Sequence, residues 1–318
     1  MKCRLRRVAG FAALGAALCA TALAQAAADQ TSADALTRAR TMAVSGELPQ
    51  AESILRDLIR SQPSSADAHF LLGYVLFREG KATASLAEFT VGARTRRPAA
   101  DDFRIIASDY VLLHDYSDAV KWFLEVAKET PSDPVAWYLL GRAQYNNQDF
   151  RSAITSFQHA LTLRAQYVEA ENNLGLAWQG LGDPADAEIA FRVAIGWQGS
   201  HPSDAQPYLN LGDLLVQEDK GEQALPSLQT AVRLAPANPR IHEELGRAYE
   251  SGGNLARAQQ ELEKAAALAP EVSGLHYELG RIYQREGQPS RAREQFDICA
   301  KLNATHSSTE TPNPFSPE

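Results

Sequence analysis

The sequence predicts an all-α protein in which about eight helix–turn–helix units stack into an elongated solenoid. A small residue recurs every 34 residues, with one step of 37, and three further positions keep the same period. The chain is also 45% hydrophobic but only 8% aromatic, a composition that suits helices packed through small side chains.

The four periodic positions differ in size. The first is small and comprises Ala39, Gly73, Ala107, Gly141, Gly175, Gly212, Gly246 and Gly280. The second is also small and comprises Ala51, Ser85, Ala119, Ala153, Ala187, Ala224, Ala258 and Ala292. The third is large and apolar: Leu55, Phe89, Phe123, Phe157, Phe191, Leu228, Leu262 and Phe296. The fourth is mostly small: Leu58, Gly92, Val126, Ala160, Ala194, Ala231, Ala265 and Cys299.

Each period predicts two antiparallel helices. The first helix contains a Leu-Gly pair such as Leu140–Gly141, and a turn rich in Gly, Asp or Asn follows. The second helix then presents its small and large apolar residues at helical spacing. Asp183–Pro184 predicts an N-cap followed by proline at the first helical position. One helix pair cannot bury its own apolar face, so the pairs must stack, with the large residues filling the gaps beside the small ones.

The repeat boundaries follow from this register. The predicted divisions are a signal peptide over 1–26, a linker over 27–31, an array over 32–306 and a disordered tail over 307–318. The eight repeats are 32–65, 66–99, 100–133, 134–167, 168–204, 205–238, 239–272 and 273–306.

The N-terminal segment has the pattern of a secretory signal. A basic stretch, "MKCRLRR", precedes an uncharged apolar stretch, and "AQA" at Ala24–Ala26 has the small residues that signal peptidase requires. We therefore expect export to the periplasm or beyond the cell, with cleavage after Ala26. An uncleaved inner-membrane anchor is the alternative, although the apolar run is short for a span. Lipidation at Cys19 is disfavoured because Leu18 precedes it.

Charge and cysteine content narrow the class of partner. Removing residues 1–26 takes away four basic residues and no acidic one, which makes the formal net charge of −8 more negative still. Binding to a phosphate backbone requires clustered positive charge, so no nucleic-acid partner is expected. Cleavage would leave Cys299 as the only cysteine, which excludes an internal disulfide and points to packing as the source of stability.

These registers resemble the tetratricopeptide repeat. Its pattern, W-x2-L-G-x2-Y followed by A-x3-F, Ala and Pro, matches the fourth and seventh repeats. The matching residues are Trp137, Leu140, Gly141, Ala153, Phe157 and Ala160, then Leu245, Gly246, Tyr249, Ala258, Ala265 and Pro270. The resemblance implies a right-handed superhelix in which the first helix of each pair lines a concave groove.

The same resemblance places a set of side chains in that groove, in the first helices. The predicted peptide-binding residues are Phe70, Tyr74, Phe77, Tyr138, Arg142, Tyr145, Asn172, Asn173, Leu176, Asn210, Asp213, Arg247, Tyr277 and Arg281. Asn173 and Asn210 share one register, where stacked amides could hold a peptide backbone, and Arg142 could bind a carboxylate. The alternative is that these are surface residues that make contacts between repeats.

No motif indicates catalysis, a cofactor or a metal site. His69, His242 and His276 share one register, which indicates packing, and "HEEL" at His242 lacks the second histidine of a metalloprotease motif. We therefore expect a non-catalytic scaffold that binds a polypeptide segment, in envelope assembly, secretion or a multiprotein complex. The alternatives are a self-associating structural module and a carrier of a sugar or lipid. A membrane partner is expected only if the signal segment is retained.

Overall fold

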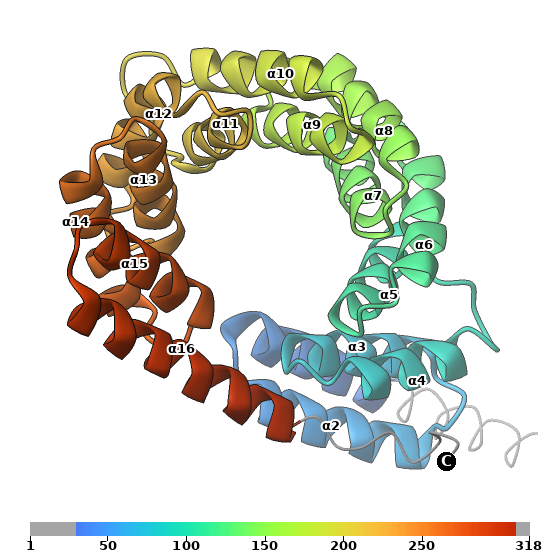
Figure 1. Cartoon of the computed structure of the whole chain (residues 1–318). Coiled ribbons are helices and arrows are strands. Elements are labelled where there is room, and N and C mark those ends of the chain that lie inside the picture. Colours follow the sequence, from blue (N-terminus) through green and yellow to red (C-terminus); the bar gives the residue numbers. More distant parts are fainter. Residues whose placement is uncertain (1–29, 310–318) are drawn as a thin grey trace, which may run out of the picture. The chain divides into compact units, whose positions relative to one another are not determined.

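The computed structural model describes residues 30–309, and every regular element in that range is an α-helix (Figure 1). The predicted all-α class is therefore confirmed. The proposed signal peptide and most of the proposed tail lie outside the described residues. Within the described residues, no helix is long and apolar enough to cross a membrane.

The chain divides after Asn147 into two compact units. The first contains a helix over residues 30–45, then α2 (Leu48–Ser61), α3 (Ala66–Arg78), α4 (Ala82–Gly92), α5 (Ala100–Leu112), α6 (Tyr116–Glu129) and α7 (Pro134–Asn146). The second contains α8 (Phe150–Leu163), α9 (Val168–Leu181), α10 (Pro184–Trp197), α11 (Gln206–Gln217), α12 (Gly221–Leu234), α13 (Pro239–Ser251), α14 (Leu255–Leu268), α15 (Ser273–Arg285) and α16 (Pro289–Thr309).

The helices pair as the period predicts. Within a repeat α3 packs on α4, α5 on α6, α9 on α10, α11 on α12, α13 on α14 and α15 on α16. The first helices of successive repeats also contact one another, α3 with α5, α9 with α11, and α11 with α13. In the second unit the first helices therefore follow one another along one side, with the second helices on the other (Figure 1). Each unit thus presents a face built from first helices, named here the first-helix face.

The small and large registers interlock inside each repeat. A Cβ added to Gly73 would lie 2.7 Å from the ring of Phe89, and one added to Gly175 would lie 2.5 Å from the ring of Phe191. Phe89, Phe157 and Phe191 are among the largest fully buried side chains. Each glycine thus makes room for an aromatic ring 16 residues later, which is the packing that the sequence predicts.

Local signals set the helix ends. The Asp183 side chain accepts a hydrogen bond from the backbone N–H of Asp186, and Pro184 occupies the first turn of α10, as predicted. Pro226 lies inside α12, which begins five residues earlier at Gly221. Cys299 of the fourth register is half-buried, whereas Ala265 at the same position one repeat earlier is fully buried.

The longer connection after α10 is held by hydrogen bonds from one side chain, that of Gln198. Oε1 of Gln198 accepts from the backbone N–H groups of Ser203 (3.1 Å) and Asp204 (2.9 Å). Its Nε2 donates to the carbonyl oxygen of Asp204 at 3.1 Å. The three extra residues of the fifth repeat therefore form a local loop while the next helix pair keeps its register.

Candidate functional site

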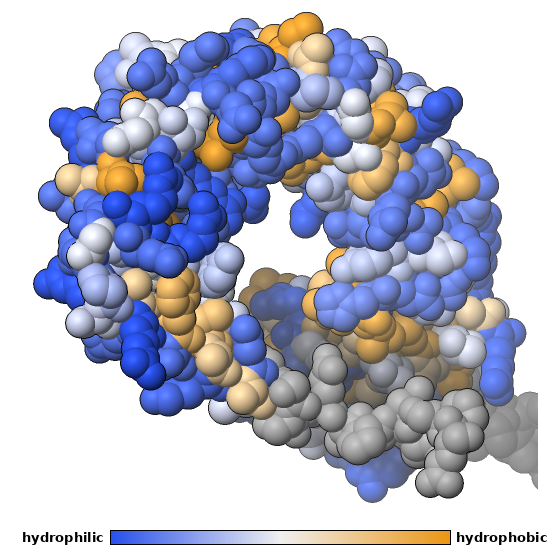
Figure 2. Space-filling model, viewed as in Figure 1, coloured by the Kyte–Doolittle hydropathy of each residue, from blue (hydrophilic) through white to orange (hydrophobic). Residues whose placement is uncertain are grey.

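The first-helix face of the first unit contains an apolar pocket of about 200 Å³. Side chains from α3, α5, α6 and α7 line it: Phe77, Ser108, Val111, Leu112, Phe123, Leu139, Arg142, Ala143 and Asn146. Two leucines at the end of α5 extend it onto the surface, because Leu112 is 51% exposed and Leu113 is 44% exposed. Apolar residues gather on the visible surface around α5 (Figure 2). The pocket thus opens beside an exposed apolar patch.

Arg142 provides the positive charge of this pocket. Its guanidinium lies 5.8 Å from the centre of the Tyr138 ring, an arrangement that favours a cation–π contact. Arg142 is exposed and forms no ion pair with any residue that the structure describes. By contrast, Arg104 on α5 is paired with Asp133 at 2.9 Å. The pocket therefore has an apolar floor and an uncompensated cation at its rim.

The predicted site residues of the first unit differ in what they contact. Phe77 and Arg142 line the pocket, and Tyr138 lies against Arg142. Tyr74 accepts a hydrogen bond from Arg78 at 2.6 Å. The prediction for Phe70 is wrong, because this ring is only 4% exposed and stacks on Phe89 at 5.8 Å, in the core. Tyr145 is half-buried.

Sequence reasoning missed part of the pocket: Val111, Leu112, Leu139 and Asn146. One signal was available, because "VLL" at Val111–Leu113 places three apolar residues where α5 ends and the turn begins. Most such turns of this chain begin with polar residues, so an apolar run there indicates an exposed patch.

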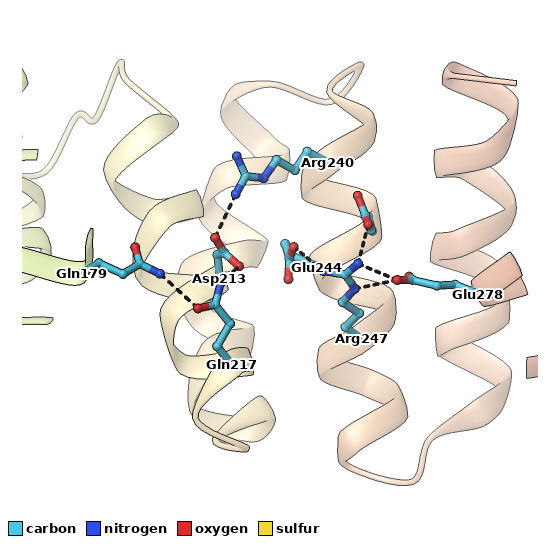
Figure 3. A network of polar contacts seen from close by, with 8 residues as sticks. Gln179, Asp213, Gln217, Arg240, Glu244, Arg247 and Glu278 are labelled. Carbon is cyan, nitrogen blue, oxygen red and sulfur yellow. Dashed lines mark hydrogen bonds and ion pairs between the residues drawn. The ribbon is translucent and has the colours of Figure 1, made fainter. Parts of the chain in front are cut away.

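On the first-helix face of the second unit, polar side chains form hydrogen bonds and ion pairs with one another (Figure 3). Gln179 on α9 donates to Gln217 on α11 at 3.1 Å, and Gln217 donates to Asp213 at 2.7 Å. Asp213 in turn accepts from Arg240 on α13 at 2.8 Å. These four side chains connect three successive first helices. The carboxylate of the predicted site residue Asp213 is therefore bonded within this face, where it links two successive repeats.

Arg247 is the centre of a second cluster on the same face (Figure 3). Its guanidinium donates to Glu243 at 2.6 Å, to Glu244 at 3.1 Å and, from Nε, to Glu278 on α15 at 2.9 Å. Glu250 on the same helix accepts from Arg281 and Arg285 of α15 at 3.1 and 2.6 Å. The surface over α13 and α14 is mostly hydrophilic in Figure 2. Arg247 and Arg281, both predicted to bind a ligand, therefore join α13 to α15.

Burial changes the acid–base behaviour of two carboxyl groups. Glu244 is 2% exposed, and burial raises its pKa to about 7, with the charge of Asp213 adding to the shift and Arg247 opposing it. Asp109 in the first unit is fully buried, and burial raises its pKa to about 6, with the nearby Ser85 hydroxyl opposing the shift. That hydroxyl donates to the carbonyl oxygen of Gly73 at 2.8 Å, and neither oxygen of Asp109 accepts a hydrogen bond in the described part of the chain.

The predicted stack of Asn173 and Asn210 that would hold a peptide backbone is not formed. Asn210 is 3% exposed and donates instead to Asn172 at 2.9 Å, and it accepts from Gln206 at 2.8 Å. Asn173 donates to the carbonyl oxygen of Glu169 in its own helix, at 2.7 Å. Residue 172 faces the neighbouring helix and residue 173 does not, because adjacent helical residues point about 100° apart. Asn210 is therefore used in a contact between α9 and α11, and Asn173 bonds within its own helix.

The two remaining predicted residues differ in exposure. Leu176 is half-buried and packs against the core of the second unit. Tyr277 on α15 is 52% exposed, and its ring centre lies 5.9 Å from that of Phe296.

With this geometry established, the chain can be assigned to a family. It belongs to the tetratricopeptide repeat family, whose sequence pattern matches residues 36–102, 138–205 and 209–273. It is similar to the tetratricopeptide repeat-containing protein trd-1 of Caenorhabditis elegans, 24% identical over 200 residues that cover 61% of this chain and 24% of that one. The match thus spans about a quarter of that relative.

Solved structures have the same fold. A tetratricopeptide repeat protein from Parabacteroides merdae superposes with a TM-score of 0.62 at 18% identity, covering 85% of this chain and 99% of its own. PilW, described as a widely conserved type IV pilus biogenesis factor, superposes with a TM-score of 0.58 at 22% identity, covering 66% and 95%. Arrays of this family typically act as scaffolds for protein–protein interaction.

Proposed function

We propose that this protein is an exported, non-catalytic scaffold that binds a polypeptide segment on the first-helix face of its first unit, in envelope assembly or a related multiprotein complex. One large apolar side chain of the partner enters the pocket between α3, α5 and α7. A carboxylate of the same segment pairs with Arg142. The observation on which this rests is an apolar pocket with an unpaired arginine at its rim.

The volume of the pocket limits what enters it. An engineered apolar cavity of about 150 Å³ holds one benzene, whereas sites for drug-sized ligands are about 300–1,000 Å³. A pocket of about 200 Å³ therefore fits one aromatic or branched aliphatic side chain. Phe77, Phe123 and Leu139 supply the apolar walls that such a side chain requires. The exposed Leu112 would then be covered by the flanking residues of the segment.

Charge favours an acidic neighbour for that side chain. An arginine fork binds a carboxylate through two parallel hydrogen bonds, and the pair is stronger where water is partly excluded. Arg142 lies at the edge of apolar surface and has no carboxylate partner in the described residues. In the second unit, by contrast, Arg240 and Arg247 are already paired with acids of their own face. The first-helix face of the first unit thus has a cation without a carboxylate partner among the described residues, whereas the polar clusters of the second unit strengthen contacts between repeats.

A random peptide library displayed on phage tests the proposed site. We expect the wild-type protein to enrich peptides with Phe, Leu or Tyr next to Asp or Glu, or next to a free C-terminus. Arg142→Glu should lose these peptides and enrich apolar residues next to Lys or Arg. Leu112→Asp should abolish enrichment.

A matched control is available in the second unit. Ile189 is 60% exposed on α10, and Arg151 is exposed on α8. Ile189→Asp and Arg151→Glu should leave the enriched peptides unchanged. Enrichment that survives Arg142→Glu and Leu112→Asp, or that lacks the apolar–acidic pattern, would overturn this site.

The proposed export is tested by finding the N-terminus of the mature protein. The signal pattern predicts that the mature chain begins at Ala27, so mass spectrometry of the protein from its native host should find that N-terminus in the periplasmic or secreted fraction. Recovery of the intact N-terminal segment in the membrane fraction would instead support the uncleaved anchor.

A further inference from the structure

A hydrogen bond to the preceding turn recurs at the start of several first helices. The ring Nε2 of a histidine lies about 3 Å from the carbonyl oxygen of a proline six residues earlier in three repeats. The pairs are His69 with Pro63 (3.0 Å), His242 with Pro236 (2.9 Å) and His276 with Pro270 (3.0 Å). All three histidines are at most 6% exposed. The shared register predicted from the sequence is therefore a structural joint.

A fourth repeat identifies which atom holds the proton. At the same register, the indole Nε1 of Trp137 donates to the carbonyl oxygen of Pro131 at 2.9 Å. An indole nitrogen is only a donor, and a carbonyl oxygen is only an acceptor. The joint therefore requires an N–H at this position, which assigns the proton of each histidine to Nε2.

The other ring nitrogen faces the second helix of the same repeat. Nδ1 lies beside a side chain 19 residues later: Glu88 for His69 (2.6 Å), Glu261 for His242 (2.7 Å) and Gln295 for His276 (2.7 Å). Because Nε2 already has one proton, a neutral ring has only a lone pair at Nδ1. A carboxylate also has only lone pairs, so a bond at this distance needs a second proton between them. An amide can turn its NH₂ group toward Nδ1 and needs none.

We propose that the His69–Glu88 joint and the His242–Glu261 joint each hold one proton between the two side chains, whereas the His276–Gln295 joint needs none. Loss of this proton opens the first two joints and leaves the third closed. Each joint connects a first helix both to the turn before it and to its second helix. Opening it loosens the connection between two successive repeats. The chain thus contains two proton-dependent joints and one proton-independent joint of the same geometry.

The charges around each pair are consistent with a bridging proton. Glu261 also accepts a hydrogen bond from Lys264 at 2.9 Å. Burial by itself raises the pKa of Glu261, but the hydrogen bonds from Lys264 and His242 outweigh this effect, so the pKa is lowered. The lowered pKa keeps Glu261 ionised, so its oxygens can only accept hydrogen bonds. From α2, Arg56 and Arg60 line a hollow with Glu88. These arginines are paired with Glu52 and Asp57.

Amide hydrogen exchange of the full chain, read by mass spectrometry, tests the joints. Because opening a joint releases one proton, the protection factor in the first turns of α3 and α13 should fall by up to about tenfold per pH unit when the pH is raised from 7 to 9. The first turn of α15 should not change. Protection factors divide out the intrinsic pH dependence of exchange.

Reciprocal substitutions supply the controls. Glu261→Gln should remove the pH dependence at α13 while keeping its protection at pH 7, and Gln295→Glu should create a pH dependence at α15. In ¹⁵N NMR spectra at pH 7, the His242 ring should show two protonated nitrogens in the wild type and one in Glu261→Gln. Equal pH profiles at α13 and α15, or a His242 ring with a bare Nδ1 in the wild type, would overturn the proposal. Circular dichroism confirms that each variant is folded.

Discussion

Arg247 on α13 and Glu278 on α15 form a two-point contact, in which Nε and Nη2 of the arginine both donate to Oε1 of the glutamate, at 2.9 and 2.5 Å. The same guanidinium bonds Glu243 and Glu244 of its own helix. One guanidinium therefore bonds three glutamate side chains from two successive repeats.

Replacing Arg247 by alanine should destabilise the second unit. The change leaves Glu244, which is 2% exposed, without its cation, and it removes the contact to α15. Because the arginine itself is 39% exposed, we expect a loss of about 1–3 kcal/mol in the free energy of unfolding rather than the larger cost of a fully buried pair. Urea denaturation measures it, and Arg151→Ala is the exposed control. Equal midpoints for the two variants would contradict this.

Glu244 should make the second unit less stable as the pH rises. Burial raises the pKa of Glu244 from 4.5 to about 7, so the folded state binds more protons than the unfolded state between these values. The free energy of unfolding therefore falls as the pH rises from about 4.5 to 7 and stays low above it. Glu244→Gln should flatten this slope and unfold at higher urea concentration than the wild type at pH 8. A slope that persists in the variant would assign it to other groups.

Asp109 gives the first unit a similar dependence. This side chain is fully buried, while the same register holds Val75 in the second repeat and Leu214 in the sixth. Asp109→Val should raise the free energy of unfolding at pH 8 by about 1–3 kcal/mol, because no buried carboxylate remains to be ionised. The gain should shrink below pH 6, near the pKa of Asp109 at about 6, where the wild-type group is protonated. The variant Asp109→Asn cannot ionise but keeps a buried polar group, so it should flatten the pH dependence without the gain in stability expected for Asp109→Val.

Two glycines in the second unit should respond in opposite directions to alanine. A Cβ at Gly175 would lie 2.5 Å from the Phe191 ring, whereas one at Gly274 would meet nothing within 4 Å. Gly175→Ala should therefore cost about 1–3 kcal/mol through overpacking. Gly274→Ala should stabilise by about 0.4–1 kcal/mol, because it reduces the freedom of the unfolded chain. Thermal unfolding of both variants measures the contrast, and a loss of stability in both would contradict the packing account.

The sequence predicted the periodic core well and the surface less well. Phe89, Phe157 and Phe191 lie where the period places them, because the same pair of helices recurs and each large residue has a fixed small partner. The period identifies a face of a helix but not the depth of a residue on it. For that reason Phe70, which shares a face with the pocket residue Phe77, proved to be a core residue.

The pairing of side chains depends on angles that the period does not resolve. Asn210 pairs with Asn172 rather than Asn173, a difference of one residue. The apolar pocket depends on the end of α5, where Leu112 departs from the repeat pattern. Departures from a repeat are visible in a sequence, but their meaning depends on neighbours that only the folded chain brings together.

The Gln198 side chain has a consequence for engineering. Because it bonds the backbone at Ser203 and Asp204, it closes residues 199–203 into a loop whose ends are fixed. Ser200 and His201 at the tip are exposed. A fluorophore, an epitope or a short foreign sequence can therefore be inserted between them without shifting the phase of the repeats that follow. This loop offers a reporter position in the second unit, in a different unit from the pocket that we propose for the partner.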